Sequence, residues 1–386
     1  MKKSIWKFAT RFLANVLKSN NMSYHAVFLL KSPLQLLNAL EACQHFGIAR
    51  RECVLVLMAD HKSLPQMLSL VKKTSGWGGT VSLVNVGLDP SIQESDGLSH
   101  ERHAIWGNDA FGIIKLKNLA RRLGRLDYVF LGDLGNLMMR HFANLADVSE
   151  VVALDDGTAT LQYAVWRNQG RWGRKQRLSK KAGLWLKRIA LGLRDNLPGR
   201  LTFFSAYEIE VPPQDLVVKN TFMDLRAQAG DMPLEESVFF LGGPLVEASI
   251  LSEEEYLWHL ERVARYFSNR KVTYVAHRRE NWERVKRIGR ALGWDVRLFD
   301  YPIEFQLAVV GPRPRILAAF FSSALENCRA IFGDMLTIYA FTLSDDQFAR
   351  KAERGESVKN VYDRYARLSG EFFHVVDIHN TLEPIA

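Results

Sequence analysis

Residues 151–157 read Val-Val-Ala-Leu-Asp-Asp-Gly, an apolar run that ends in an acid pair and a glycine. Residues 272–280 repeat this design, since Val-Thr-Tyr-Val-Ala runs into His277-Arg278-Arg279-Glu280. Short apolar runs of this kind are typical of buried strands in parallel α/β sheets, and ligands of such sheets bind at the carboxyl ends of the strands. The sequence therefore predicts two half-sites facing a cleft, one able to take a proton and one able to hold an anion.

Strands and helices alternate outward from these two stretches. We expect strands at residues 26–30, 54–58, 80–86, 128–131 and 151–154, and, after a proline-marked break between 211–213 and 231–233, at 237–241, 271–276, 296–299, 316–320 and 330–332. Helices are expected between them at residues 33–42, 64–73, 113–123 and 137–146, and at 253–267, 281–292, 304–310 and 323–329. Such alternation indicates mostly parallel, doubly wound sheets.

Length favours two domains, because 386 residues exceed the size at which a single core usually stops growing. We place an N-terminal extension at 1–22, an N-terminal Rossmann-like domain at 23–230 (acceptor side, with the catalytic base) and a C-terminal Rossmann-like domain at 231–386 (donor side). Two such domains around a cleft form the GT-B architecture of nucleotide-sugar glycosyltransferases, an outline that periplasmic-type binding proteins and some kinases share. The predicted fold class is α/β of the GT-B type.

Composition excludes several function classes. With 47% hydrophobic and 24% charged residues the chain is an ordinary globular protein. Its three cysteines have neither a disulfide pattern nor metal-ligand spacing, which indicates a reducing compartment and no structural zinc. The segment 132–136, Gly-Asp-Leu-Gly-Asn, lacks the glycine spacing of a dinucleotide fingerprint, and no Walker loop or Asp-x-Asp motif occurs. We expect chemistry without a metal or cofactor.

Basic charge is concentrated in two amphipathic segments. The chain carries a net charge of +9, and residues 167–200 combine eleven Lys and Arg side chains with interleaved tryptophan and aliphatic residues. Residues 1–22 show a similar pattern, but they lack the uninterrupted apolar core and small-residue cleavage site of a secretory signal and the roughly 20 apolar residues of a membrane span. Both segments are typical of helices on an anionic membrane surface. The alternatives are a helix packed on its own domain at 167–200, and a docking helix or an upstream extension at 1–22; nucleic acid is disfavoured.

The motifs resemble those of bacterial sialyltransferases, closest to the lipooligosaccharide sialyltransferase and polysialyltransferase families. Those families carry an acidic-acidic-Gly motif, a His-Pro motif and a Ser/Thr pair. The matching residues here, in family order over about residues 24–341, are Lys31-Ser32-Pro33-Leu34-Gln35, Asp155-Asp156-Gly157, His277-Arg278 and Ser322-Ser323. One departure is that Arg278 stands where the family has proline, while the following Arg279-Glu280 is retained.

The resemblance implies an inverting, metal-independent transfer from a CMP-linked 2-keto sugar. Such a transfer needs a base for the acceptor hydroxyl. In the family pattern the first acid is the more critical one, so the resemblance implies Asp155 as the base with Asp156 as its orienting neighbour. Adjacent carboxylates also raise each other's proton affinity, which suits a base at neutral pH. His277 and the pair Ser322 and Ser323 at a helix N-terminus would bind the phosphate of the departing CMP. The alternatives are a helix-start acid pair, a structural histidine and a plain helix cap.

Further contacts are expected around these groups. Arg278 and Arg279 join His277 in binding CMP, and Glu304 resembles the acid that holds the ribose hydroxyls, with an exposed first-turn glutamate as the alternative. Gly243 would line the nucleotide pocket or simply make a turn. Substrate contacts are expected from Ser32 and Gln35, against a role in helix capping.

The sequence thus predicts a cytoplasmic enzyme, peripheral on the inner face of the cytoplasmic membrane. It would transfer sialic acid or a related nonulosonate from CMP to a lipooligosaccharide, O-antigen or capsule, held near that acceptor by segments 1–22 and 167–200. Alternatives are transfer of another CMP-keto sugar, such as Kdo, pseudaminic or legionaminic acid, or non-catalytic binding of a glycan or nucleotide. The resemblance also allows a homodimer, which the sequence leaves open.

Overall fold

The computed structural model describes residues 23–60, 62–83, 108–170, 192–194, 196–343 and 352–378. The chain separates into two compact units between Asn220 and Thr221. The sequence placed the corresponding boundary after residue 230, so the short helix α10 (Met223–Ala229) belongs to unit 2. The segment 1–22 lies outside the described residues.

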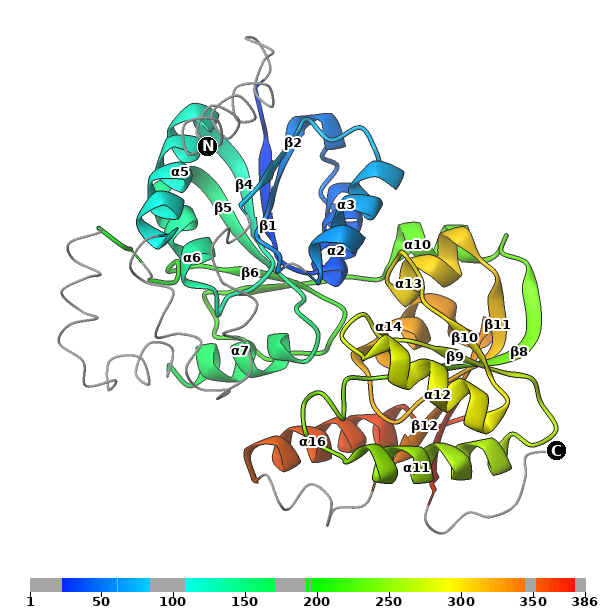
Figure 1. The fold of residues 1–386 in the computed structure, drawn as a ribbon. Coiled ribbons are helices and arrows are strands. Elements are labelled where there is room, and N and C mark those ends of the chain that lie inside the picture. The colour runs from blue at the N-terminus through cyan, green and yellow to red at the C-terminus, as the bar shows by residue number, and fades with distance from the viewer. Residues whose placement is uncertain are drawn as a thin grey trace, which may run out of the picture. The chain divides into compact units, whose positions relative to one another are not determined.

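Unit 1 is built on a seven-stranded parallel sheet (Figure 1). The strands are β1 (Ala26–Leu30), β2 (Cys53–Leu57), β3 (Gly79–Ser82), β4 (Arg125–Leu131), β5 (Asp147–Leu154), β6 (Thr202–Ser205) and β7 (Leu216–Lys219). The helices are α2 (Pro33–His45), α3 (Leu64–Lys73), α5 (Asn108–Leu123), α6 (Leu137–Leu145) and α7 (Ala159–Asn168), with a 3₁₀ turn at Arg50–Glu52. The spatial order of the strands is β3-β2-β1-β4-β5-β6-β7.

Both faces of this sheet are covered. On one face Leu116 of α5 and Phe142 of α6 pack against Val27 and Leu29 of β1. On the other face Phe28 stacks on Phe130 with ring centroids 4.2 Å apart. All five residues of β1 are fully buried, which explains why this strand reads as a continuous apolar run.

Unit 2 contains a six-stranded parallel sheet. Its strands are β8 (Leu234–Leu241), β9 (Val272–Val275), β10 (Asp295–Arg297), β11 (Arg313–Ala319), β12 (Thr337–Thr342) and β13 (Phe373–Asp377). Besides α10, the helices are α11 (Glu253–Tyr266), α12 (Trp282–Leu292), α13 (Ile303–Phe305), α14 (Ser323–Phe332) and α16 (Ala352–Leu368). Helix α13 continues into a π-helical turn at Gln306–Val310, and a 3₁₀ turn at Gly333–Met335 follows α14. The neighbouring helices α11 and α12 pack on one face of the sheet (Figure 1).

The strand order identifies each unit as Rossmann-like. In unit 2 it is β10-β9-β8-β11-β12-β13, the doubly wound 3-2-1-4-5-6 order, and unit 1 shows the same order with a seventh strand added. The predicted fold class, two parallel-sheet Rossmann-like domains of the GT-B type, is confirmed. In each sheet the order reverses next to the first strand, between β1 and β4 and between β8 and β11. Ligands of such sheets bind in the crevice at this reversal.

Individual elements differ from the sequence prediction in informative ways. Residues 330–332 are not a strand but the last turn of α14, because this apolar stretch buries Ile331 and Phe332 from a helix. The next strand is β12, and the strands β6, β7, β12 and β13 are not among those predicted from the sequence. The predicted strand at 80–86 is described only as β3, which ends at Ser82.

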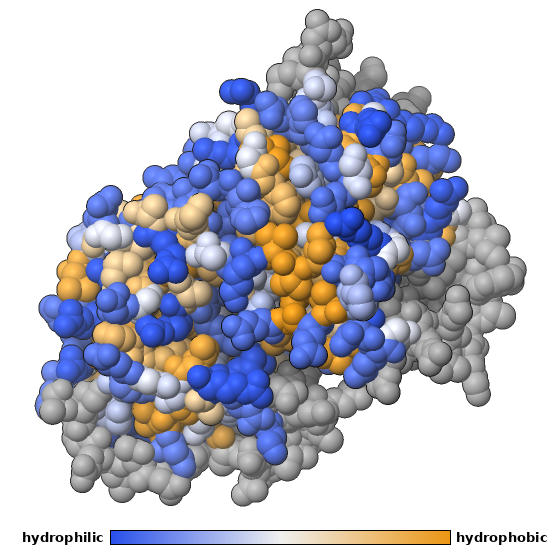
Figure 2. All heavy atoms as spheres, turned by 180° about the vertical axis from the view of Figure 1, so that it is seen from behind, coloured by the Kyte–Doolittle hydropathy of each residue, from blue (hydrophilic) through white to orange (hydrophobic). Residues whose placement is uncertain are grey.

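The surface mixes polar side chains with apolar patches (Figure 2). At the edge of the first sheet β7 leaves Leu216 and Val217 exposed. Among the described residues we find no helix that is long and apolar enough to span a membrane.

Candidate active site

Four neighbouring strands of unit 1 end in polar residues at the same edge of the sheet. In spatial order, Lys31 follows β1, Asp133 follows β4, the acid pair follows β5, and Ser205 ends β6. These strands are parallel and adjacent, so their carboxyl ends gather residues that are up to 174 positions apart in sequence. The predicted acid pair is thus one part of a larger polar cluster, of which Lys31, Asp133 and Ser205 were not predicted as site residues.

Asp155 is enclosed and fully engaged. Its side chain is buried, and its Oδ1 and Oδ2 accept hydrogen bonds of 2.6 Å each from the Ser205 hydroxyl and the Ala206 N–H. Burial raises the pKa of Asp155 to about 6, although these two donors, Thr160 and the charge of Lys219 lower it. A carboxylate held at both oxygens joins β5 to the end of β6.

Asp156 is the more accessible member of the pair. It is partly buried, and its Oδ1 accepts a 2.6 Å hydrogen bond from the Gln35 Nε2. Burial and then the negative charge of Asp133 raise the pKa of Asp156 to about 6, against the lowering effect of Lys31 and Gln35. The next residue, Gly157, has a φ of 59°, in the left-handed region that favours glycine. A carboxylate with this pKa, at the entry to α7, has the properties of a general base near neutral pH.

The residues of the predicted substrate contacts in α2 have other neighbours. Ser32 is the N-cap of α2, where its Oγ accepts the Gln35 N–H at 3.3 Å. Gln35 is fully buried and donates a hydrogen bond to Asp156, so it fixes that carboxylate from the protein interior. Asn38, one turn further along, donates to the Asp155 carbonyl oxygen at 3.0 Å and accepts from Asn220. The polar face of α2 therefore fixes the main chain of Asp155 and the side chain of Asp156.

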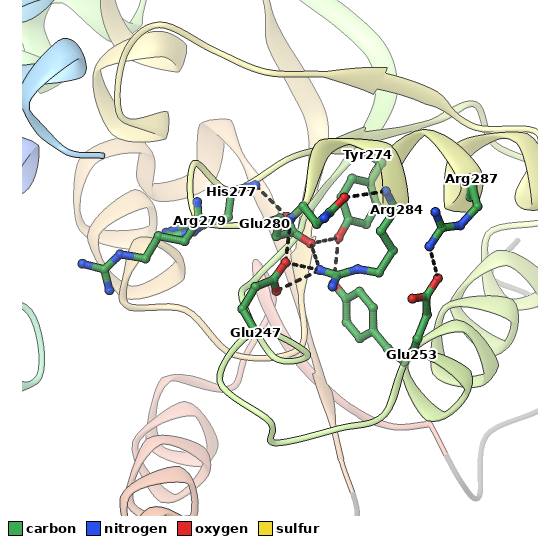
Figure 3. Close-up of polar contacts among 10 residues, drawn as sticks. Glu247, Glu253, Tyr274, His277, Arg279, Glu280, Arg284 and Arg287 are labelled. Carbon is green, nitrogen blue, oxygen red and sulfur yellow. Dashed lines mark hydrogen bonds and ion pairs between the residues drawn. The ribbon is translucent and has the colours of Figure 1, made fainter. Parts of the chain in front are cut away.

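In unit 2 the His277-Arg278-Arg279-Glu280 turn follows β9 and is closed by Glu280 (Figure 3). Glu280 Oε2 accepts the His277 main-chain N–H at 2.7 Å, and the Glu280 N–H donates to the His277 carbonyl oxygen at 2.9 Å. The His277 Nδ1 accepts the Arg279 N–H at 3.2 Å, so the neutral ring carries its proton on Nε2. His277 is partly exposed, and its Nε2–H is a donor suited to a phosphate oxygen.

Glu280 rests on a buried polar network (Figure 3). Its Oε1 accepts the Tyr274 hydroxyl at 2.6 Å, which in turn lies 2.8 Å from the Tyr256 hydroxyl. Arg284 lies 3.8 Å from the same carboxylate, and its Nη2 donates to both carboxylate oxygens of Glu247, at 2.7 and 2.8 Å. Burial raises the pKa of Glu280 to about 7 despite these donors. Hydrogen bonds that the Glu280 carboxylate accepts thus shape this turn.

Gly242 makes room for this network at the end of β8. A Cβ at this position would lie 2.4 Å from both the Glu280 Oε2 and the Tyr274 hydroxyl oxygen. Gly243, the predicted donor contact, would meet nothing closer than 3.9 Å. Of the two glycines, Gly242 is the one whose lack of a side chain the packing requires.

Glu304 is buried rather than an exposed first-turn acid. Its Oε1 accepts a 2.9 Å hydrogen bond from the Asn327 side chain. Burial raises the pKa of Glu304, while Asn327 and the positive charge of Arg278 lower it. The charge of Arg278 therefore acts on Glu304, whereas Arg279 is exposed and its side chain extends away from the Glu280 network (Figure 3).

Ser322 and Ser323 follow β11, on the far side of the strand-order reversal from Gly243. Ser322 is the N-cap of α14, with its Oγ accepting the Ala324 N–H at 3.2 Å. The Tyr365 hydroxyl accepts the Ser322 N–H at 2.8 Å and donates to the Ser322 carbonyl oxygen at 2.7 Å. Both serines are partly exposed at the start of a ten-residue helix.

The basic segment 167–200 lies largely outside the described residues. At its start, Arg167 is engaged internally, since its guanidinium contacts both carboxylate oxygens of the buried Asp215 at 2.6 and 2.8 Å and the carbonyl oxygens of Pro198 and Gly199. Arg167 therefore packs on its own unit, which was the alternative to a membrane-facing role. Among the residues that the structure describes, no group of three or more His, Cys, Asp or Glu side chains is placed to hold a metal.

No protein-family model and no curated protein sequence matches the chain. Among solved structures it is similar to MurG from Acinetobacter baumannii, at 11% identity over 92% of this chain and 87% of that one, with a TM-score of 0.41. It is also similar to a UDP-N-acetylglucosamine 2-epimerase, at 13% identity over 86% of this chain and 82% of that one, with a TM-score of 0.44. A third similar structure is the E. coli ADP-heptose LPS heptosyltransferase II, at 12% identity over 84% of this chain and 86% of that one, with a TM-score of 0.35. Likenesses at this level assign neither a substrate nor a reaction to this chain.

Proposed function

We propose that this protein is an inverting glycosyltransferase that moves sialic acid or a related nonulosonate from its CMP donor to a bacterial surface glycan. The observation that carries the proposal is the carboxylate of Asp156, partly exposed at the carboxyl edge of the first sheet, with a pKa raised to about 6. Such a group accepts a proton from a hydroxyl as the hydroxyl attacks, and it is mostly ionised at neutral pH.

In this proposal Asp156, rather than Asp155, is the base. Both Asp155 oxygens accept hydrogen bonds inside the protein, and the residue is buried. Asp155 then orients the pair, which reverses the assignment made from the sequence.

Unit 2 is proposed to bind the CMP portion of the donor. His277 offers Nε2–H to the phosphate, and Ser322 and Ser323 offer hydroxyl and main-chain donors at the N-terminus of α14. We assign the ribose to Glu304, with Arg278, Arg279 and Gly243 as further contacts. The proposed reaction uses no metal, because the phosphate charge that grows on the leaving group is met by these donors.

The acceptor is proposed to be a lipooligosaccharide, O-antigen or capsule glycan. Location at the cytoplasmic face of the membrane, through the basic segments, belongs to the same proposal. Its support is the sequence pattern of segments 1–22 and 167–200.

The test is release of CMP from a panel of CMP-nonulosonates and CMP-Kdo, with glycan acceptors and EDTA present. We expect release from one donor, a fall of about 10²–10⁴-fold in kcat for Asp156→Asn, and loss in His277→Ala. Asp147→Asn is the matched control, since it removes an exposed carboxylate at the opposite end of the same strand. CMP binding without release from any donor would refute the transferase and favour a binding protein.

A further inference from the structure

The segment Gly132-Asp133-Leu134-Gly135 follows β4, next to the acid pair, and is not a dinucleotide motif. Asp133 is buried and its carboxylate is surrounded by donors: the Lys31 ammonium at Oδ2, and the Tyr163 hydroxyl and the Gly135 N–H at Oδ1, at 2.6 and 2.7 Å. Burial raises its pKa, but the charge of Lys31 and these donors outweigh burial and hold the pKa of Asp133 below its usual value. Asp133 is therefore a fixed negative charge.

Gln35 connects this ion pair to Asp156. The Lys31 main-chain N–H donates to the Gln35 Oε1 at 2.7 Å, and the Gln35 Nε2 donates to the Asp156 Oδ1 at 2.6 Å. Because the oxygen of the amide is occupied by an N–H donor, only its NH₂ end can face the carboxylate. The amide is thereby oriented to hydrogen-bond the ionised form of Asp156.

Gly132 provides the space for this amide. A Cβ on Gly132 would lie 2.2 Å from the Gln35 Oε1, and a Cβ on Gly135 would lie 2.6 Å from the Tyr163 hydroxyl. Both glycines are thus required by close approach of the side chains in this network. Their spacing is explained by the fit of Gln35 and Tyr163.

We propose that Lys31 and Asp133 are positioning residues for Asp156. The Lys31 main-chain N–H fixes the Gln35 amide, and the charge pair of Lys31 and Asp133 balances the field at the Asp156 carboxylate. This rests on the proposed function in one respect, since it takes Asp156 as the base. The groups that face Asp156 are Lys31 after β1, Gln35 on α2, Asp133 after β4, Thr160 and Tyr163 on α7, and its neighbour Asp155.

Removing either charge of the pair should shift the pKa of Asp156, and the two single variants should shift it in opposite directions. Asp133→Asn leaves the Lys31 charge uncompensated and is expected to lower the pKa of Asp156 by about half to one unit. Lys31→Met leaves the Asp133 charge and is expected to raise it by a similar amount. The double variant removes both charges and should return the pKa close to that of the wild type. Tyr163→Phe, which removes a neutral hydroxyl, should have a smaller effect than either charge change.

The primary measurement is a ¹³C NMR titration of the Asp156 carboxyl in the full-length protein, assigned with Asp156→Asn. The second is the acidic limb of the kcat/KM profile for CMP release, which should move in the same direction as the NMR pKa. Shifts in the same direction for both single variants, or no shift in either, would overturn the pairing. If Asp133→Asn does not fold, the result for Lys31→Met decides alone. The Lys31 side chain is 39% exposed, so its replacement should leave the protein folded.

The two readouts separate failure of this inference from failure of the proposed function. Opposite NMR shifts in a wild-type protein that consumes no CMP-sugar would support the charge pair and refute the transferase. Turnover with an unmoved NMR pKa would support the transferase and refute the charge pair.

Discussion

Replacing Glu280 with glutamine tests whether the turn that carries His277 depends on a buried carboxylate. The side chain of Glu280 is 1% exposed, and its pKa is raised from 4.5 to about 7 by burial. A folded-state pKa above the unfolded value means that the carboxyl stabilises the fold fully below pH 4.5. This stabilisation is lost as the pH rises to about 7 and changes little above it.

The size of the effect follows from the two pKa values. Between pH 5 and pH 8 the ionisation of Glu280 should lower the free energy of unfolding of unit 2 by about 2 kcal/mol, at 1.36 kcal/mol per unit of pKa shift. Glutamine cannot ionise, yet its Oε1 can accept the His277 N–H and its Nε2 can donate to the Tyr274 oxygen. Glu280→Gln should therefore keep the turn and remove the pH dependence.

Native-state hydrogen exchange of the amides in β8 and β9 measures this in the intact chain. At each pH the intrinsic exchange rates nearly cancel between variant and wild type, so the difference reports the opening free energy. We expect the stability of Glu280→Gln relative to the wild type to rise by about 2 kcal/mol from pH 5 to pH 8. The matched control is Glu254→Gln, an exposed carboxylate on α11. A difference that is the same at both pH values, or that falls, would refute the reasoning.

Three further changes test the packing. Gly242→Ala places a methyl group against the Glu280 carboxyl and should destabilise β8 by about 1–3 kcal/mol, measured by hydrogen exchange. Protection equal to that of the wild type would contradict the requirement for glycine at this position. Arg167→Ala leaves the buried Asp215 carboxylate without its ion-pair partner and should lower the free energy of unfolding of unit 1 by about 3–5 kcal/mol, measured in urea. The loss of a surface ion pair would lower it by less than about 1 kcal/mol. Ser252→Ala removes the capping box of α11 and should cost about 1 kcal/mol in urea unfolding, and an unchanged stability would contradict the role of this cap.

The sequence could predict which strands end in reactive groups, because a buried parallel strand is a local apolar run. The acid pair after β5 and His277 after β9 were found in this way. Asp133, which follows β4 after Gly132, is not among the predicted site residues. What the sequence did not reveal is that β4 lies between β1 and β5, since the spatial order of strands is set by tertiary packing.

Burial was equally hard to predict. Gln35 and Asp156 are 121 residues apart, and only the parallel register of the strands brings them together. Glu304 follows a proline and was considered as an exposed acid, but α13 and the π-helical turn after it bury this side chain against Asn327. A hydrophobic pattern says little about a charged side chain whose partner lies on another element.

The two units use the same device to hold their reactive residues. In each, a buried carboxylate accepts one main-chain N–H and one hydroxyl: Asp155 accepts from Ala206 and Ser205, and Glu280 from His277 and Tyr274. Each of these carboxylates has a raised pKa, because the loss of water on burial outweighs the donors and positive charges that lower the pKa. Asp155 and Glu280 should therefore stabilise their surroundings most at acid pH, where both carboxyls are protonated. The proposed base Asp156 is ionised at higher pH. The proposed reaction would thus run at a pH at which the buried carboxylates Asp155 and Glu280 stabilise the fold least.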